Sequence, residues 1–327
     1  MAYSTSDKYS TLVSDWNAEM ASFVPTWSSF ASLIDTNAAA LRRWSDLPAG
    51  ILPDIDPSSS SLDMTGPVTA YGSVAEQTIT PQAKGGGFKL HQLDTRLDSS
   101  LVDRVAEKLL RSAQQTIEAG VYTFLASTFT AAVDNSNNSG SGDATSPVCS
   151  THSGGSGGFW YDSDSNGVAD AQFSTKIGVA LDASNLSTAR ALMRKQKTFT
   201  GVPSGHGSGA LTLVVPVDLE DAAITAAKSR ELPTTFSATS ATGANMNPQS
   251  TRSYEIVASG HLSDANDWWL IDGTRESPIK VWVPEVGRPQ LTIWQNPGTG
   301  NLELGCSFYM KVFCDAPPVG IVGSSVS

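Results

Sequence analysis

The segment from Asp98 to Thr128 constrains the fold of this chain more than any other. Its apolar residues recur every three or four positions, the spacing of an amphipathic α-helix with one buried face. Side-chain oxygens between Asp98 and Ser100 can cap its first turn. If Gly120 does not interrupt it, this helix is roughly 35–40 Å long. The residues of the buried face are Val102, Val105, Leu109, Ala113, Ile117, Val121, Phe124 and Leu125.

Composition places the chain among globular proteins of one large or two ordinary domains. It has 327 residues, of which 40% are hydrophobic and 16% charged, and its net charge is −11. An acidic chain without clustered Lys and Arg is not expected to bind nucleic acid along its surface. We find no apolar run of 18 residues and no basic, then apolar, start, so neither a membrane partner nor a signal peptide is expected.

The three cysteines do not indicate a disulfide scaffold. Cys306 and Cys314 belong to one extended segment, which places them roughly 26 Å apart. Cys149 stands alone in a polar stretch. A reducing compartment is therefore expected. The chain begins with Met1, from which we expect no N-terminal scaffold segment to be cleaved off.

Residues 1–62 resemble an arm with little core of its own. Thr11–Met20 and Phe30–Trp44 carry apolar residues at helical spacing, and prolines separate such pieces. The large rings in this region pack either on the main core or on another subunit. We take these rings as candidate subunit contacts: Trp16, Trp27 and Trp44.

Residues 63–97 resemble a long hairpin whose apolar content is thin for an independent sheet. The turn chemistry is assigned to Thr80-Pro81 and to a run of one lysine and three glycines. This run is expected at the tip of the hairpin and is a second candidate subunit contact. It consists of Lys84, Gly85, Gly86 and Gly87.

The rest of the chain alternates between loops, helices and strands. The stretch Asp134–Gly158 is rich in Gly and Ser and reads as a long loop. Leu302–Val312 alternates apolar and polar residues, which indicates a strand with one buried face. The tail from Pro317 to Ser327 is expected to be a strand or a loop at the surface. Helices are expected at Ser184–Lys197 and Leu219–Ser229, and further strands at Leu211–Val215, Ser253–Ala258, Trp268–Ile271, Ile279–Val283 and Gln290–Trp294.

No stretch of the sequence makes a strong case for catalysis. The four histidines, at His91, His152, His206 and His261, lack metal-ligand spacing. Gly154–Gly158 matches G-x-S-x-G, but it has no strand before it and no helix after it. A serine hydrolase is therefore a poor hypothesis, and the chain is predicted not to be an enzyme.

One polar loop has the spacing of a calcium site. Its oxygen donors occupy alternating positions, and Gly167 allows a tight turn. Phe173 stands where an EF-hand has its bidentate glutamate, so an EF-hand is excluded. The alternatives are a weaker calcium site and a plain polar turn. The candidate ligands are Asp162, Asp164, Asn166 and Asp170, and no other cofactor is expected.

Several short motifs resemble those of a known family in sequence and in order. Leu211–Arg230 (LTLVVPVDLEDAAITAAKSR) is an apolar strand ending in Val-Val-Pro, followed by a helix. Ala180–Lys197 reads as the preceding helix, and Cys149–His152 as an upstream Ser-Thr-His element. Trp268–Asp272 and then Pro278–Val281 follow in the same order. Together they resemble the major head subunits of tailed phages, in particular the Mu-like major head family.

This resemblance implies the α+β fold of the Hong Kong 97-type capsid proteins. That fold comprises an N-terminal arm, an extended E-loop hairpin, a peripheral domain with a long spine helix, and an axial domain. The Gly/Ser-rich insertion at 134–173 departs from a minimal version of it. The implied division is 1–62 arm, 63–97 E-loop, 98–179 peripheral domain with the insertion, 180–290 axial domain, and 291–327 return strand and tail.

The resemblance implies that many copies form the pentamers and hexamers of an icosahedral head. The shell would be assembled in the host cytoplasm, become part of the virion and enclose double-stranded DNA without specific recognition. Scaffold, portal and decoration proteins are the further partners implied. Two alternatives stay open: an encapsulin-like compartment shell, and a calcium-dependent β-rich binding or adhesin protein built on the Asp162–Asp170 loop. The buried face of the 98–128 helix is expected to pack on Leu302–Val312.

Overall fold

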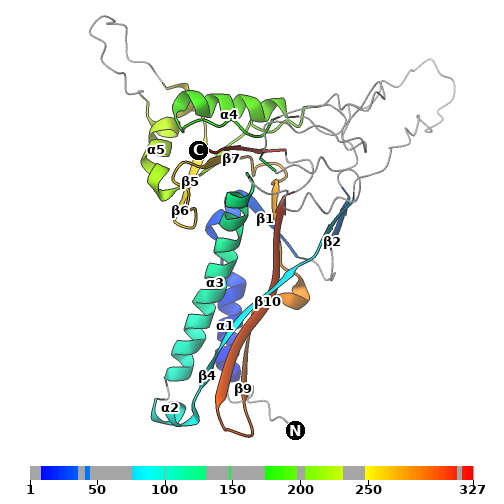
Figure 1. Ribbon diagram of the computed structural model, residues 1–327, viewed down its shortest axis with the longest axis vertical. Coiled ribbons are helices and arrows are strands. Elements are labelled where there is room, and N and C mark those ends of the chain that lie inside the picture. Colours follow the sequence, from blue (N-terminus) through cyan, green and yellow to red (C-terminus); the bar gives the residue numbers. More distant parts are fainter. Residues whose placement is uncertain are drawn as a thin grey trace, which may run out of the picture. The chain divides into compact units, whose positions relative to one another are not determined.

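The computed structural model divides the chain into two compact units, each assembled from three separate segments (Figure 1). Unit 1 contains Met1–Leu41, Thr80–Leu125 and Ile279–Phe313. Unit 2 contains Arg42–Ile79, Ala126–Pro278 and Cys314–Ser327. The structure describes residues 9–35, 41–44, 76–98, 100–129, 147–148, 174–196, 203–230, 247–314 and 319–326.

Helix α3 (Leu101–Ser127) confirms the long helix expected from the sequence, and it passes through Gly120 without a break. Every residue of the predicted apolar face is buried. At Gly120 an added Cβ would collide with Met310 Cε of strand β10 (Leu302–Cys314). The helix and the strand therefore lie against each other, as predicted (Figure 1).

Strand β10 is central to the sheet of unit 1. It pairs antiparallel with β4 (Gln82–Leu90) on one side and with β9 (Gln290–Gln295) on the other. β10 also neighbours β8 (Ile279–Trp282). β8 pairs in turn with β1 (Ala31–Ile34), which runs parallel to it. The sheet thus combines segments from three distant parts of the chain.

The side chains of β10 alternate as the sequence predicted. From Leu302 to Met310 every second residue is buried, and the residues between them are exposed or half-buried. The alternation stops beyond Met310, since Phe313 and Cys314 are both fully buried. One face of the strand therefore packs in the core.

The segment Phe30–Trp44, predicted as a helix, instead contains β1 and a second strand, β2 (Leu41–Trp44). A 3-10 helix at Thr26–Ser29 precedes β1. Helical spacing over a short apolar run does not distinguish a helix from a strand. Pairing of β1 with β8, in a distant part of the chain, decides the outcome. Helix α1 (Ser10–Ser22) confirms the earlier helix and packs against β9.

Unit 2 is built on a four-stranded sheet in the order β11-β7-β5-β6. β5 (Leu211–Pro216) is parallel to β6 (Tyr254–Ser259) and antiparallel to β7 (Trp268–Ile271), which pairs with β11 (Ile321–Ser324). All six residues of β5 are buried, as in a strand that is covered on both faces.

The tail expected at the surface is instead part of this core. All four residues of β11 are buried, and the backbone of Gly323 bonds with Thr175 and Ile177 on the side away from β7. Val322 belongs to the main hydrophobic cluster. Helices α4 (Ala183–Lys195) and α5 (Glu220–Lys228) supply the other layer. The buried members of that cluster are Leu186, Ala189, Met193, Leu211, Leu213, Val215, Ala223, Ala226, Ala227, Tyr254, Trp268, Leu270 and Val322.

Helix α4 is capped by a residue that the sequence did not single out. Asp182 Oδ1 accepts a hydrogen bond from the backbone N–H of Asn185 over 2.7 Å, which caps the first turn of the helix. The unit boundary falls after Pro278, so β8 and β9 group with unit 1. The other elements are β3 (Glu76–Ile79), which pairs with β2, α2 (Gln92–Leu97), and 3-10 helices at Val217–Leu219, Pro248–Thr251 and Glu285–Gly287.

Candidate assembly surface

The run Lys84–Gly87 lies in the middle of a strand and does not form the hairpin tip that was predicted. Lys84 stands opposite Phe308 of β10, and Gly87 stands opposite Gly305. Thr80 and Pro81 separate β4 from the preceding strand, β3 (Glu76–Ile79). A run of glycines is typical of a turn when read in isolation, but here pairing with β10 satisfies its backbone. Residues 63–75 of the expected hairpin lie outside the described part of the chain.

Two of these glycines are required by the close approach of β4 to β10. A Cβ at Gly87 would lie 2.7 Å from the carbonyl oxygen of Leu304, and one at Gly85 would lie 3.0 Å from that of Cys306. At Gly86, by contrast, an added Cβ meets nothing within 4 Å. The run of glycines therefore serves the packing of β4 against β10 rather than the geometry of a turn.

The face of the sheet opposite the buried side chains of β10 carries small side chains at its centre. Gly87, Gly305 and Thr292 stand side by side on β4, β10 and β9, so small side chains pave its centre. Trp294 is 43% exposed at the edge of this area. The structure has a shallow groove here, of about 330 Å³, lined by Gly87, Phe88, Lys89, Thr292, Trp294, Glu303, Leu304 and Gly305.

One ion pair crosses this groove. Lys89 Nζ lies 3.7 Å from Glu303 Oε1, and both side chains are solvent-accessible. An exposed pair of this kind contributes roughly 0–1 kcal/mol. Its effect is to orient charge beside the Trp294 ring rather than to stabilise the fold. A half-exposed indole beside a paired charge is a composition typical of contact surfaces.

The arm tryptophans are not on this surface. Trp16 and Trp27 are 3% and 2% exposed, and the Trp16 indole donates a hydrogen bond to the Ala106 carbonyl over 3.0 Å. Both rings thus pack on the core of unit 1, the first of the two alternatives that the sequence left open. Contact of either ring with another copy would require the arm to leave that core. The side chain of Trp44 lies outside the described residues.

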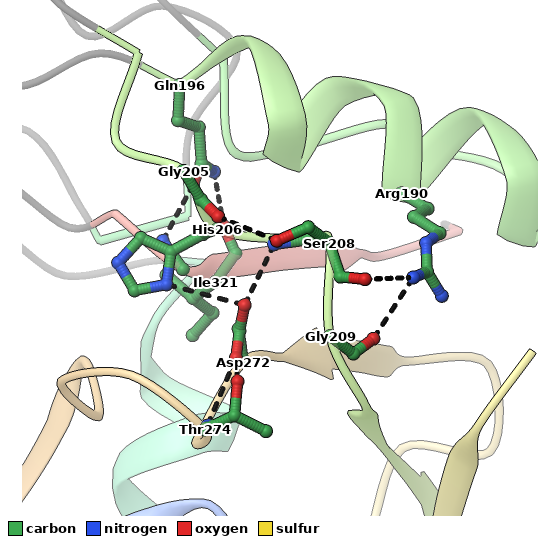
Figure 2. Close-up of polar contacts among 11 residues, drawn as sticks. Arg190, Gln196, Gly205, His206, Ser208, Gly209, Asp272, Thr274 and Ile321 are labelled. Carbon is green, nitrogen blue, oxygen red and sulfur yellow. Dashed lines mark hydrogen bonds and ion pairs between the residues drawn. The ribbon is translucent and has the colours of Figure 1, made fainter.

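A polar network in unit 2 joins the loop at 203–209 to the C-terminal strand (Figure 2). Gln196 donates to the Ile321 carbonyl over 2.8 Å and accepts from the Gly320 amide over 2.7 Å. Asp272 accepts from the Gly207 amide and from Thr274. Because these partners come from distant segments, the network ties the chain end to the sheet of unit 2.

Asp272 is held as a carboxylate within this network. Burial alone would raise the pKa of its carboxyl, but the nearby His206 ring and hydrogen bonds from Thr274 and the Gly207 amide outweigh burial and hold that pKa well below its ordinary value. His206 Nδ1 is 3.6 Å from Asp272 Oδ2, which is longer than a hydrogen bond. The contact with His206 is therefore a close polar contact rather than a hydrogen bond.

These groups do not form a nucleophilic triad. A triad needs a histidine hydrogen-bonded both to the carboxylate and to the nucleophile. The Ser208 hydroxyl donates instead to the Gly205 carbonyl over 3.1 Å, and the His206–Asp272 contact is too long. His91 has a structural role, since its Nδ1 accepts from the Leu93 amide at the start of α2.

The candidate calcium loop lies outside the described residues. Within the residues that are described, no group of three or more His, Cys, Asp or Glu could hold a metal ion, and no helix is long and apolar enough to span a bilayer. Cys306 and Cys314 are buried, and burial raises the pKa of the Cys306 thiol, so this thiol is unreactive at neutral pH.

A family model described as "Phage capsid protein" matches residues 75–322 of the chain. The chain belongs to the phage capsid protein family. It is a capsid shell protein, and this family is structural rather than enzymatic. Membership of the Mu-like subfamily stays a prediction. A search of curated proteins gives no match.

Several solved structures are similar to this capsid protein, with TM-scores of 0.44 to 0.51. The capsid of the cyanophage P-SCSP1u is 8% identical with a TM-score of 0.51, covering 93% of this chain and 88% of that chain. The holo-SrpI encapsulin complex of Synechococcus elongatus PCC 7942 is 10% identical with a TM-score of 0.49, covering 93% and 88%. Mycobacterium phage Che8 gives 12% and 0.44, covering 94% and 90%. The fold is the Hong Kong 97 type, as predicted.

Two features of the capsid surface escaped sequence reasoning. The alternation from Gln290 to Gln295 indicates which residues of β9 face inward, and it could have identified Trp294 as the exposed aromatic residue. The exposure of β4 on both faces had no such signal, because it depends on how far the helices cover the sheet.

Proposed function

We propose that this capsid protein is the major head subunit of a tailed phage. Many copies form pentamers and hexamers, and these close into an icosahedral shell that is assembled in the host cytoplasm and encloses double-stranded DNA. Scaffold, portal and decoration proteins are its further partners. The observation that carries the proposal is the family match over residues 75–322.

The surface of unit 1 supports a role in contacts between copies. The sheet face that carries Trp294 beside the Lys89–Glu303 pair offers flat area and an aromatic anchor. The net charge of −11 supports the proposed cargo relationship, because an acidic shell repels packaged DNA rather than gripping it.

An encapsulin-like compartment is the second candidate, because encapsulin shells share the Hong Kong 97-type fold. The two candidates differ in cargo and not in architecture. Particles that package nucleic acid in the presence of a phage's terminase and portal support the head subunit. Particles that instead take up a specific protein cargo support the compartment.

Electron microscopy of the purified full chain is the direct test of the proposed function. We expect capsomers or closed icosahedral shells, alone or with a co-expressed scaffold protein. A protein that stays monomeric at high concentration, with and without the scaffold, would show that the proposed function is wrong. It would revive the β-rich binding protein as an alternative.

We also keep the Asp162–Asp170 loop as a proposed calcium site within this function. Replacing Asp162 and Asp164 by Ala should abolish any difference in melting temperature between samples with calcium and samples with chelator. Asp134→Ala in the same Gly/Ser-rich region is the matched control and should leave that difference intact. An unmodified protein that melts at the same temperature in both conditions would reject the site.

A further inference from the structure

Four arginines from three separate segments of unit 2 gather beside the loop at 203–209. They come from helix α4, from the segment before β6 and from the segment after β7. We call them the arginine cluster. Its members are Arg190, Arg194, Arg252 and Arg275.

Arg190 is the buried member of the cluster. Its Nη2 donates to the carbonyl oxygens of Ser208 over 3.2 Å and Gly209 over 3.0 Å (Figure 2). Its guanidinium also lies 5.6 Å from the centre of the Tyr254 ring. The side chain is 7% exposed, and none of these three partners carries a negative charge. The charge of Arg190 therefore adds to the positive potential at the surface above it.

Two exposed members lie against glycines of the loop. A Cβ at Gly207 would lie 2.9 Å from Arg194 Cγ, and one at Gly205 would lie 2.8 Å from Arg275 Nη1. Both glycines have positive φ angles, of 80° and 75°. Because the loop has no side chain at these positions, both arginines can approach its backbone closely, and both stay exposed to solvent.

Arg252, also exposed, joins the cluster through Tyr254. Arg252 Nη1 donates to Gln249 Oε1 over 3.3 Å, and the Tyr254 hydroxyl donates to the same oxygen over 2.7 Å. Since the Tyr254 ring lies against the Arg190 guanidinium, one series of contacts runs from Arg252 to Arg190 and on to the loop.

The fold thus gathers positive charge that the sequence keeps apart. The segments that meet here contain five Lys and Arg residues and two acids, Asp272 and Glu276, although the whole chain has 21 basic and 32 acidic residues. Asp272 is buried and already accepts from the Gly207 amide and from Thr274. The fifth cation, Lys195, and Arg194 suit the last turn of a helix, but that role does not explain Arg252 or Arg275. The segments counted are 190–196, 203–209, 249–254 and 272–276.

We propose that the arginine cluster binds the phosphate backbone of the packaged DNA. This inference rests on the proposed shell function, and it names the surface of unit 2 that meets the cargo. The planar guanidinium fork matches two oxygens of one phosphate. Because Arg190 and the loop lie between them, the exposed members occupy separate points of the surface, as a regular series of phosphates requires. Such contacts respond to charge and not to base sequence.

The net charge of −11 keeps each contact weak. The rest of the chain repels DNA, so a single copy holds DNA only at low salt. Many copies in one shell multiply these weak contacts, as in any multivalent binding. The shell can therefore position the DNA beside it without gripping the whole cargo.

Fluorescence anisotropy with a labelled DNA duplex of about 30 base pairs tests the inference on the unassembled full chain. We expect binding at about 50 mM salt that weakens with a log–log slope of roughly −3, because each of three exposed arginines releases counterions from one phosphate. Replacing Arg194, Arg252 and Arg275 together by Gln should weaken binding at least tenfold. Arg275→Gln alone, at an exposed position, should reduce the slope by about one, which keeps the test valid if the triple variant does not fold.

The matched control removes the same charge from the exposed face of α3. Arg104, Lys108 and Arg111 are replaced together by Gln; the two arginines form ion pairs with Asp98 and Glu107. This variant should bind DNA within about twofold of the unmodified chain, because its cations are not gathered against DNA. An equal loss in both triple variants, or no binding by the unmodified chain at low salt, would overturn the inference and leave the proposed function standing.

Assembly of the cluster variant separates DNA from another copy as the partner. Particles should form normally, because the cluster contacts cargo and not a neighbouring subunit. Loss of assembly with unchanged DNA binding would overturn the inference. Absence of any oligomer of the unmodified chain would instead overturn the proposed function, and with it the packaged cargo.

Discussion

Gly120 marks the point where the spine helix α3 lies closest to strand β10. Met310 fills the space in which a side chain at Gly120 would stand. Glycine in a helix interior costs roughly 1 kcal/mol relative to alanine, so its presence here reflects the need for close packing. Gly120 lowers the helix propensity at one position, and its lack of a side chain allows the helix to pack closely on the sheet.

We predict that Gly120→Leu lowers the free energy of unfolding by about 1–3 kcal/mol, because the larger side chain overpacks this contact. Urea denaturation measures the change. Gln115→Leu, at an exposed position of the same helix, is the control and should change stability by less than about 0.5 kcal/mol. In a Met310→Ala background the Gly120→Leu cost should shrink, and a cost that stays the same would contradict the contact.

Asp272 should make the stability of unit 2 depend on pH. Its carboxyl has a pKa below the ordinary value, so it contributes stability above the pKa of the unfolded chain and loses it on acidification. Asp272→Asn should therefore lower the melting temperature at pH 7 and flatten its decline below about pH 5. Melting curves between pH 3 and 7 measure both effects.

Asp267 is the matched comparison, because it is a buried carboxyl of the same unit with the opposite shift. Burial raises its pKa, so its ionised form opposes folding at neutral pH and its protonated form does not. Asp267→Asn should leave the melting temperature at pH 7 unchanged or higher. If both variants lose stability equally at pH 7, the assigned directions are wrong.

At the scale of an element, the pairing of β4 with β10 depends on which glycine is replaced. Gly87→Ala should destabilise the pairing by about 1–3 kcal/mol, because its Cβ would press on the Leu304 carbonyl, which is backbone and has little freedom to move. Gly86→Ala, one residue away, should be tolerated because its Cβ meets open space. Chemical denaturation compares the two variants, and equal stabilities would refute the close approach.

At the scale of the whole molecule, each unit is completed by a segment remote in sequence. Unit 2 takes its edge strand β11 from the C-terminal end of the chain, and Gln196 fastens that end through Gly320 and Ile321. Unit 1 likewise needs β8, β9 and β10 from the last third of the sequence. Neither unit is therefore complete until the end of the chain has been placed.

We predict that truncation after Asp315 disrupts unit 2, because removal of β11 uncovers β7 and opens the main hydrophobic cluster. Fluorescence of Trp268 and Trp269, both fully buried, should shift to longer wavelength. A truncation after Ser325 keeps β11 and should leave the spectrum nearly unchanged. Native-like fluorescence in the shorter chain would contradict the role assigned to β11.

Sequence patterns succeeded where a single periodicity ran over many residues. The face of α3 and the alternation of Leu302–Met310 were each predicted residue by residue, because burial of one face imposes that period. They failed where the segment was short. Phe30–Trp44 fits a helix locally, but β1 gains its backbone partners only from β8. Lys84–Gly87 reads as a turn until β10 is placed beside it.

The sequence by itself determined the long helix, the main strands and the family motifs, since these depend on local spacing and composition. The tertiary structure alone decided that Met310 packs against Gly120, that Ile321–Ser324 becomes a buried strand, and that Lys84–Gly87 pairs with β10. The physical reason is that backbone pairing and close packing join residues far apart in the chain, and no local pattern records which partner will arrive. Helix α3, the strongest local signal, gains its role only from the strand beside it.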